Sequence, residues 1–182
     1  MPLDFTKGTH LNIFIVFLFL FLGSKVNVQK NDSENYEIYA NQLVTSFARE
    51  MKKEFGLICI GEGGCMPHDV QKMSVEFISY QRATIEQARE LEVRVTERFI
   101  EAINAHEKIR PFLREYPVQP FRAKVAICFE KKNNHSYEDG SVAYVFQVRN
   151  TIVYNKREPR PVGLVTLFEE PYDDALRIVQ SE

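Results

Sequence analysis

The sequence predicts an α+β fold: an antiparallel sheet of about six strands, covered on one face by a long central helix and two flanking helices. Two observations indicate this class. Apolar residues recur at three- and four-residue intervals in two long segments, as they do in amphipathic helices. Shorter segments alternate apolar and polar residues, as half-buried strands do. Their order along the chain is helix, hairpin, helix, four-strand meander and helix.

The first predicted helix covers residues 33–55. Asp32 or Ser33 can cap its first turn, because a short polar side chain accepts hydrogen bonds from free backbone amides there. Gly56 can adopt the left-handed conformation that commonly ends a helix. The apolar stripe of this helix consists of Tyr36, Ala40, Leu43, Phe47, Met51 and Phe55.

A hairpin is predicted next, with strands at 57–61 and about 70–80. The segment 62–68 contains two glycines and is expected to form its long turn. In the second strand, apolar residues alternate with Ser74 and Glu76, a pattern typical of a sheet with one solvated face.

The long central helix is predicted from Thr84 to about Lys108. Thr84 and Gln87 have the spacing of a capping box, and Pro111 stops or kinks the helix. Its apolar stripe consists of Ala88, Leu91, Val95, Phe99, Ala102 and Ile103.

An antiparallel meander is expected in the last third of the chain, followed by a closing helix that starts near Pro171. The sequence leaves the curvature of the sheet open. Curling around the long helix, as in cystatin-like or NTF2-like folds, would create a pocket. The four meander strands are predicted at 121–131, 142–149, 151–156 and 162–169.

The N-terminus contains an almost unbroken apolar run, Leu11 to Leu22. Its length fits the h-region of a secretory signal, about 7 to 15 residues, and is short of the roughly 20 residues that span a bilayer. A cut after Ser24 would place Leu22 where a small residue is preferred, so an uncleaved anchor stays an alternative. We therefore expect a signal peptide or N-terminal anchor over 1–24, a polar spacer over 25–32 and a single globular domain over 33–182.

The charge balance restricts the partners. The formal net charge is -2 at pH 7, and a protein that binds nucleic acid would be expected to carry a basic face or a high pI. We expect no nucleic acid partner and no cofactor. Membrane contact is expected only through residues 11–22, if that segment is retained.

The chain has three cysteines, so at most one disulfide can form within it. Cys59 and Cys128 lie in apolar, strand-like runs and are expected to behave as small hydrophobic residues. Cys65 lies in the glycine-rich segment and is either a half-cystine or an exposed free thiol. A histidine brought near it by folding could act as the base that activates Cys65 as a nucleophile. The flanking residues of known cysteine enzymes are absent, however. No C-x-x-C metal or redox motif is present.

Two residues of the central helix, Glu92 and His106, project on its apolar side. A buried carboxylate or imidazole could serve acid-base chemistry or ligand binding. The two residues are about 21 Å apart along the helix axis and cannot form one catalytic pair. The alternative is that Glu92 pairs with a nearby arginine such as Arg89 and that His106 lies at the exposed helix end.

A basic cluster after the central helix could meet an anionic partner. Acidic residues are interleaved with it at Glu107 and Glu115, which favours a solvated surface instead. The cluster consists of Arg110, Arg114, Arg122 and Lys124.

Three segments of the chain resemble a family of small, exported bacterial proteins to which no activity is assigned. The resemblance covers most of the chain after the N-terminal segment, and it implies export and a single domain. The segments are Gly61-Glu62-Gly63-Gly64, Ile85-Glu86-Gln87-Ala88-Arg89-Glu90-Leu91 and Ile109-Arg110-Pro111-Phe112-Leu113-Arg114-Glu115-Tyr116-Pro117.

The sequence thus predicts an exported or envelope-associated, non-catalytic module that binds a protein or a small ligand. Export would place it in the periplasm, at the envelope or outside the cell. Two alternatives stay open: a hydrolase whose site is not recognisable from sequence, and a structural envelope component anchored by an uncleaved N-terminus. The candidate binding residues are Cys65, Glu92, His106, Arg110 and Arg114.

Overall fold

The computed structural model describes residues 32–133, 135, 137, 139–159 and 161–181. The predicted signal or anchor segment, residues 1–24, lies outside the described residues, as does the spacer up to residue 31. The elements are α1 (Asp32–Phe55), β1 (Ile58–Cys65), β2 (Lys72–Ser79), α2 (Ile85–Ala105), the 3-10 helices η1 (Arg110–Phe112) and η2 (Pro120–Arg122), β3 (Ala123–Phe129), β4 (Tyr144–Val148), β5 (Thr151–Glu158), β6 (Gly163–Pro171) and α3 (Tyr172–Gln180).

The fold is α+β, and the six strands form one mixed, mostly antiparallel sheet in the order β1-β2-β3-β4-β5-β6. The expectation of a fully antiparallel sheet is wrong at one place, because β2 and β3 run parallel. The cause is the connection between them. The 21 residues of α2 carry the chain about 31 Å back along the sheet, so that β3 starts at the same end as β2.

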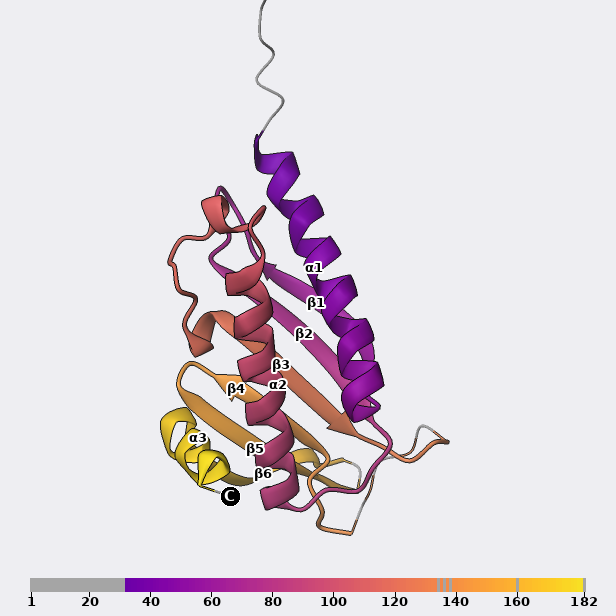
Figure 1. The fold of residues 1–182 in the computed structure, drawn as a ribbon. Coiled ribbons are helices and arrows are strands. Elements are labelled where there is room, and N and C mark those ends of the chain that lie inside the picture. Colours follow the sequence, from indigo (N-terminus) through magenta and orange to yellow (C-terminus); the bar gives the residue numbers. More distant parts are fainter. Residues whose placement is uncertain (1–31, 134, 136, 138, 160, 182) are drawn as a thin grey trace, which may run out of the picture.

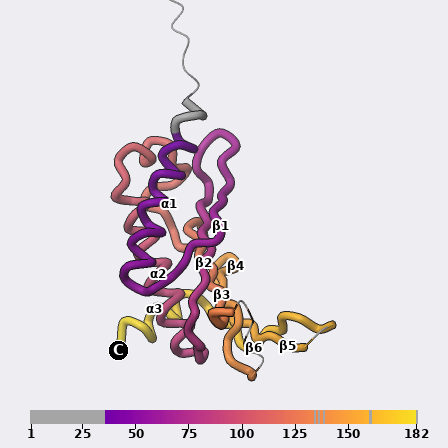
Figure 2. Tube along the Cα trace, turned by 90° about the vertical axis from the view of Figure 1, so that its right-hand side faces the viewer, coloured from indigo at the N-terminus to yellow at the C-terminus, as the bar shows by residue number. Residues whose placement is uncertain are grey.

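All three helices lie on the same side of the sheet. Figure 1 shows α2 between α1 and α3 in front of the strands, and the turned view in Figure 2 shows them displaced to one side of the sheet. The strands therefore have one face that packs against helices and one that does not.

The core lies between the helices and the sheet. In β2 and β3 every second side chain, such as Phe77 and Ile127, is fully buried, while the residues between them are partly exposed. The capping box at Thr84 and Gln87 is present, and Gly56 has a φ of 69° after α1. These local predictions are confirmed.

The first half of the predicted turn, residues 62–65, belongs to a strand, and the chain reverses between residues 66 and 71 instead. β1 continues to Cys65 and pairs with β2 as far as Lys72, with a register shift between Cys59 and Gly61. Its glycines allow a close approach between the strands. A Cβ atom on Gly64 would lie 2.5 Å from the carbonyl oxygen of Lys72, which is closer than van der Waals contact permits.

Candidate functional site

The helix-free face of the sheet carries a row of half-buried polar and aromatic side chains. They occupy the positions that alternate with the core residues along β2, β3 and β4. Such a face would be expected to be fully solvated, yet these side chains shield one another. They include Ser74 and Glu76 on β2, Lys124 and Cys128 on β3, and Tyr144 and Phe146 on β4.

A groove with a volume of about 280 Å³ crosses this face. The register of the strands explains its position. Glu76 lies opposite Ala126 on β3, and Ala126 lies opposite Phe146 on β4. Because the methyl group of Ala126 is small, it leaves a hollow between the two larger side chains. The groove is lined by Glu62, Ser74, Glu76, Lys124, Tyr144 and Phe146, among others.

Glu76 has no cationic neighbour within ion-pair distance in the described part of the chain. The Cys128 thiol donates a weak hydrogen bond to its carboxylate, with Sγ 3.7 Å from Oε1. The Tyr144 hydroxyl lies close enough for the Glu76 charge to act on it. Burial and the nearby Glu76 charge raise the pKa of Cys128 to about 12 and also raise the pKa of Tyr144. Both groups are therefore protonated at neutral pH.

Lys124 lies at the other end of the groove, directly opposite Ser74. Burial, and in second place the positive charge of Lys72, lower its pKa. Neither lysine forms an ion pair with another described residue. The groove thus holds an unpaired carboxylate and, across the strand boundary, an unpaired ammonium group.

Glu92 lies in the core and not in a site open to solvent. It is 0 % exposed, neither carboxylate oxygen has a hydrogen-bond partner, and burial raises its pKa well above the usual value. The expected pairing with Arg89 is wrong, because Arg89 Nε donates to Glu170 Oε1 at 2.7 Å. The Tyr154 hydroxyl donates to the same oxygen at 2.6 Å. Glu92 is therefore a buried acid that solvent does not reach.

His106 and Cys65 have separate, local surroundings. His106 is the C-cap residue of α2, and its Nδ1 accepts a hydrogen bond from the Ile109 amide at 3.2 Å. Cys65 is an exposed free thiol at the end of β1, and Cys59 and Cys128 are free as well. The disulfide alternative is therefore not observed.

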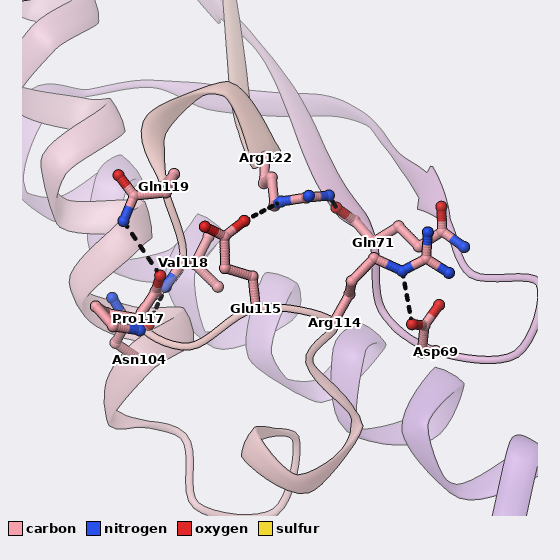
Figure 3. A network of polar contacts seen from close by, with 9 residues as sticks. All are labelled: Asp69, Gln71, Asn104, Arg114, Glu115, Pro117, Val118, Gln119 and Arg122. Carbon is pink, nitrogen blue, oxygen red and sulfur yellow. Dashed lines mark hydrogen bonds and ion pairs between the residues drawn. The ribbon is translucent and has the colours of Figure 1, made fainter.

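The predicted basic cluster does not form one anion site (Figure 3). Arg114 Nε donates to Asp69 at 2.8 Å, and Arg122 Nε donates to Glu115 at 2.7 Å. A third arginine, Arg110, donates to the Asn104 carbonyl oxygen at 2.9 Å and lies over the Tyr116 ring. These contacts hold the connection between α2 and β3 in place. Lys124, the fourth member, lies in the groove instead.

Sequence reasoning placed Ser74 and Glu76 on a solvated face but did not select them as site residues. It also missed Tyr144 and Phe146. The signal that could have found them is the pairing of β2 with β3, which brings Glu76 next to Ala126 although 50 positions separate them.

No protein family, curated protein or solved structure matches the chain. Within the described ranges, none of the helices is long and apolar enough to cross a bilayer. Among the same residues, no three His, Cys, Asp or Glu side chains are grouped as metal ligands would be.

Proposed function

We propose that this protein is an exported or envelope-associated, non-catalytic binding module, and that it takes a small ligand on the helix-free face of its sheet. In this arrangement α2 is the central helix of the covering layer, flanked by α1 and α3. The observation that carries the proposal is the groove over β1 to β4, in which unpaired charged groups lie beside two aromatic rings.

The size of the groove favours a small ligand over a protein partner. Small-molecule sites in proteins typically have volumes of about 300 to 1,000 Å³, with a few polar groups placed among apolar ones. At about 280 Å³ the groove lies just below this range. Its polar groups come from Glu76 and Lys124, and its apolar wall from Tyr144 and Phe146.

The surroundings of the candidate nucleophiles support a non-catalytic role. A thiol attacks as the thiolate, and the raised pKa of Cys128 opposes that form at neutral pH. The ring nitrogen Nδ1 of His106 is engaged by the backbone, and Glu92 is enclosed by the core. None of these groups is placed to act on a molecule in the groove.

Ligand binding is tested by recording amide NMR spectra of the protein while adding a mixture of small polar fragments. We expect the shifted resonances to belong to β2, β3 and β4. Ala126→Leu should abolish the shifts, because the larger side chain fills the hollow. Thr166→Leu adds the same side chain to an exposed position of β6 and should leave them unchanged. Unshifted spectra, or shifts that survive Ala126→Leu, would reject the groove as the ligand site.

Export is tested separately, because it depends on the Leu11 to Leu22 run. Residues 1–35 are fused to a reporter that is active only outside the cytoplasm. We expect reporter activity, and loss of that activity when Phe17 and Leu18 are both changed to Asp. A reporter that stays inactive would reject export and leave the groove proposal standing.

A hydrolase is the second candidate, and one observation favours it. Ser74 lies directly opposite Lys124, whose lowered pKa is what a lysine base beside a serine nucleophile requires. The two side chains are not hydrogen bonded to each other in the structure, so we rank this candidate second. Hydrolysis of p-nitrophenyl acetate that is lost in Ser74→Ala and in Lys124→Met would favour the enzyme. Absence of turnover would exclude this dyad for esters of that type.

A further inference from the structure

We propose that the groove recognises a small zwitterion of the α-amino-acid type with an apolar side chain. Its ammonium group would bind to Glu76, its carboxylate to Lys124 and Lys72, and its apolar part to Tyr144 and Phe146. This inference rests on the proposed function, since it names the ligand class of the same groove.

The Glu76 carboxylate is the site for the ammonium group. An ionised carboxylate can accept about four hydrogen bonds, and among the described side chains the neutral Cys128 thiol donates a weak one to Glu76. It is half-buried and has no ion-pair partner within the described residues. A partly desolvated charge in this situation is stabilised by a ligand of opposite charge that also donates hydrogen bonds.

Lys124 and Lys72 form the site for the carboxylate. Lys124 lines the groove, and Lys72 lies two residues before Ser74 on β2, on the same face and just outside the groove lining. Burial, and in second place the charge of Lys72, lower the pKa of Lys124. An anion bound between them would remove this repulsion and offset the desolvation of Lys124. Ser74 belongs to the same row and offers a hydroxyl donor, because it pairs with Lys124 in the register.

The charged groups of Glu76 and Lys124 are close enough for one zwitterion to contact both. Glu76 and Lys124 lie on neighbouring strands with an offset of two residues, since Lys124 pairs with Ser74. A strand spacing of about 4.8 Å and a rise of about 6.6 Å over two residues place their Cα atoms about 8 Å apart. Both side chains are long and flexible, so their charged ends can approach two groups attached to the same carbon atom.

An apolar surface for the rest of the ligand lies beside Glu76 and Lys124. The Tyr144 and Phe146 rings stack with centroids 5.1 Å apart at an interplanar angle of 30°. Ala126 lies between Phe146 and Glu76 in the register, which leaves room above the sheet. A side chain that extends from the α-carbon of the ligand would lie over these rings. A purely ionic ligand would leave this surface uncovered.

The test compares three probes that share a phenyl group: L-phenylalanine, phenethylamine and 3-phenylpropionate. The amine lacks the carboxylate and the acid lacks the ammonium group. Isothermal titration calorimetry with the full-length protein should show L-phenylalanine binding at least tenfold more tightly than either. Glu76→Gln should weaken L-phenylalanine and phenethylamine by tenfold or more and leave 3-phenylpropionate unchanged. Lys124→Met should weaken L-phenylalanine and 3-phenylpropionate and leave phenethylamine unchanged.

The matched controls are Glu158→Gln and Lys156→Met, which make the same changes in an ion pair of β5 outside the groove lining. Both should bind L-phenylalanine as the unchanged protein does. Equal affinity for the three probes, no binding of L-phenylalanine, or insensitivity to Glu76→Gln would each overturn the zwitterion proposal. If a groove variant does not fold, the ranking of the three probes on the unchanged protein decides.

The two proposals fail in different ways. Fragments that shift β2 to β4 resonances, combined with no preference for L-phenylalanine, reject the zwitterion and keep the binding groove. If no tested compound binds in a way that Ala126→Leu abolishes, both the binding groove and the zwitterion proposal are rejected.

Discussion

The ring of Phe99 in α2 stacks on the ring of Phe47 in α1, with centroids 4.8 Å apart and an interplanar angle of 28°. Phe47 in turn meets the edge of Phe77 in β2, with centroids 6.2 Å apart. All three side chains are at most 1 % exposed. This contact joins both long helices to the sheet that carries the groove.

The first prediction concerns this contact. Phe99→Ala should lower the free energy of unfolding by about 3 to 5 kcal/mol, because it removes a fully buried ring and leaves a cavity. Urea denaturation measures the loss. Phe168→Ala is the control, since that ring is 39 % exposed and its removal should cost much less. A loss below about 1 kcal/mol for Phe99→Ala would contradict the core assignment.

The second prediction concerns the buried acid. Burial raises the pKa of Glu92 in the folded protein above its ordinary value of 4.5, so the folded state binds the proton more tightly than the unfolded state. The corresponding stability is present below about pH 4.5 and is lost as the pH rises toward the folded pKa. Among the described residues no basic group offsets this cost. The Glu92 charge also contributes to the raised pKa values of the Tyr144, Tyr154 and Tyr172 hydroxyls.

Glu92→Gln should remove this pH dependence. The free energy of unfolding is measured for the variant and for the unchanged protein from pH 4 to 8. As the pH rises, the variant should become more stable relative to the unchanged protein. Any cost of burying the amide adds a constant and does not alter the slope. Glu90→Gln, in an exposed ion pair with Arg94 on the same helix, should leave the slope nearly unchanged. Parallel curves for Glu92→Gln and the unchanged protein would show that Glu92 is not desolvated.

The third prediction concerns thiol reactivity. Cys65 is exposed, whereas burial raises the pKa of both Cys59 and Cys128. A maleimide should therefore modify Cys65 first, and mass spectrometry of the digested protein locates the label. Cys65→Ser should leave ligand binding in the groove largely intact. Unusually fast labelling at neutral pH that disappears when His68 is changed to Ala would instead reveal an activated thiolate and favour an enzyme.

Local patterns in the sequence predict the elements of this fold well. Helical periodicity identified the stripes of α1 and α2, and period-two alternation placed Glu76 on the solvated face of β2. Helical periodicity depends on residues within about one turn, and strand alternation depends on residues two positions apart. Both patterns are therefore visible in the sequence alone. The helical wheel likewise placed Glu92 on the buried side of α2, where the structure has it.

Long-range pairings explain what was missed. The partner of Arg89 is Glu170, 81 positions away, and a local rule selected Glu92 instead. The groove depends on the parallel pairing of β2 with β3, which no local pattern shows. Lys124 was grouped with nearby arginines by sequence distance, although the sheet places it opposite Ser74.

The fourth prediction tests the corrected interpretation of β1. Gly64 lies in a strand, and a Cβ atom there would be 2.5 Å from the backbone oxygen of Lys72, which cannot move without disturbing β2. Gly64→Ala should therefore lower the free energy of unfolding by more than about 1 kcal/mol, the usual scale for a substitution that forces a steric clash.

Gly61→Ala is the matched control, because its nearest neighbour would be Glu76 Oε2 at 3.6 Å, an ordinary van der Waals distance. Chemical denaturation of both variants measures the difference, and amide exchange along β1 and β2 shows whether the loss is local. Equal stability of the two variants would contradict the pairing of β1 with β2 beyond Gly61.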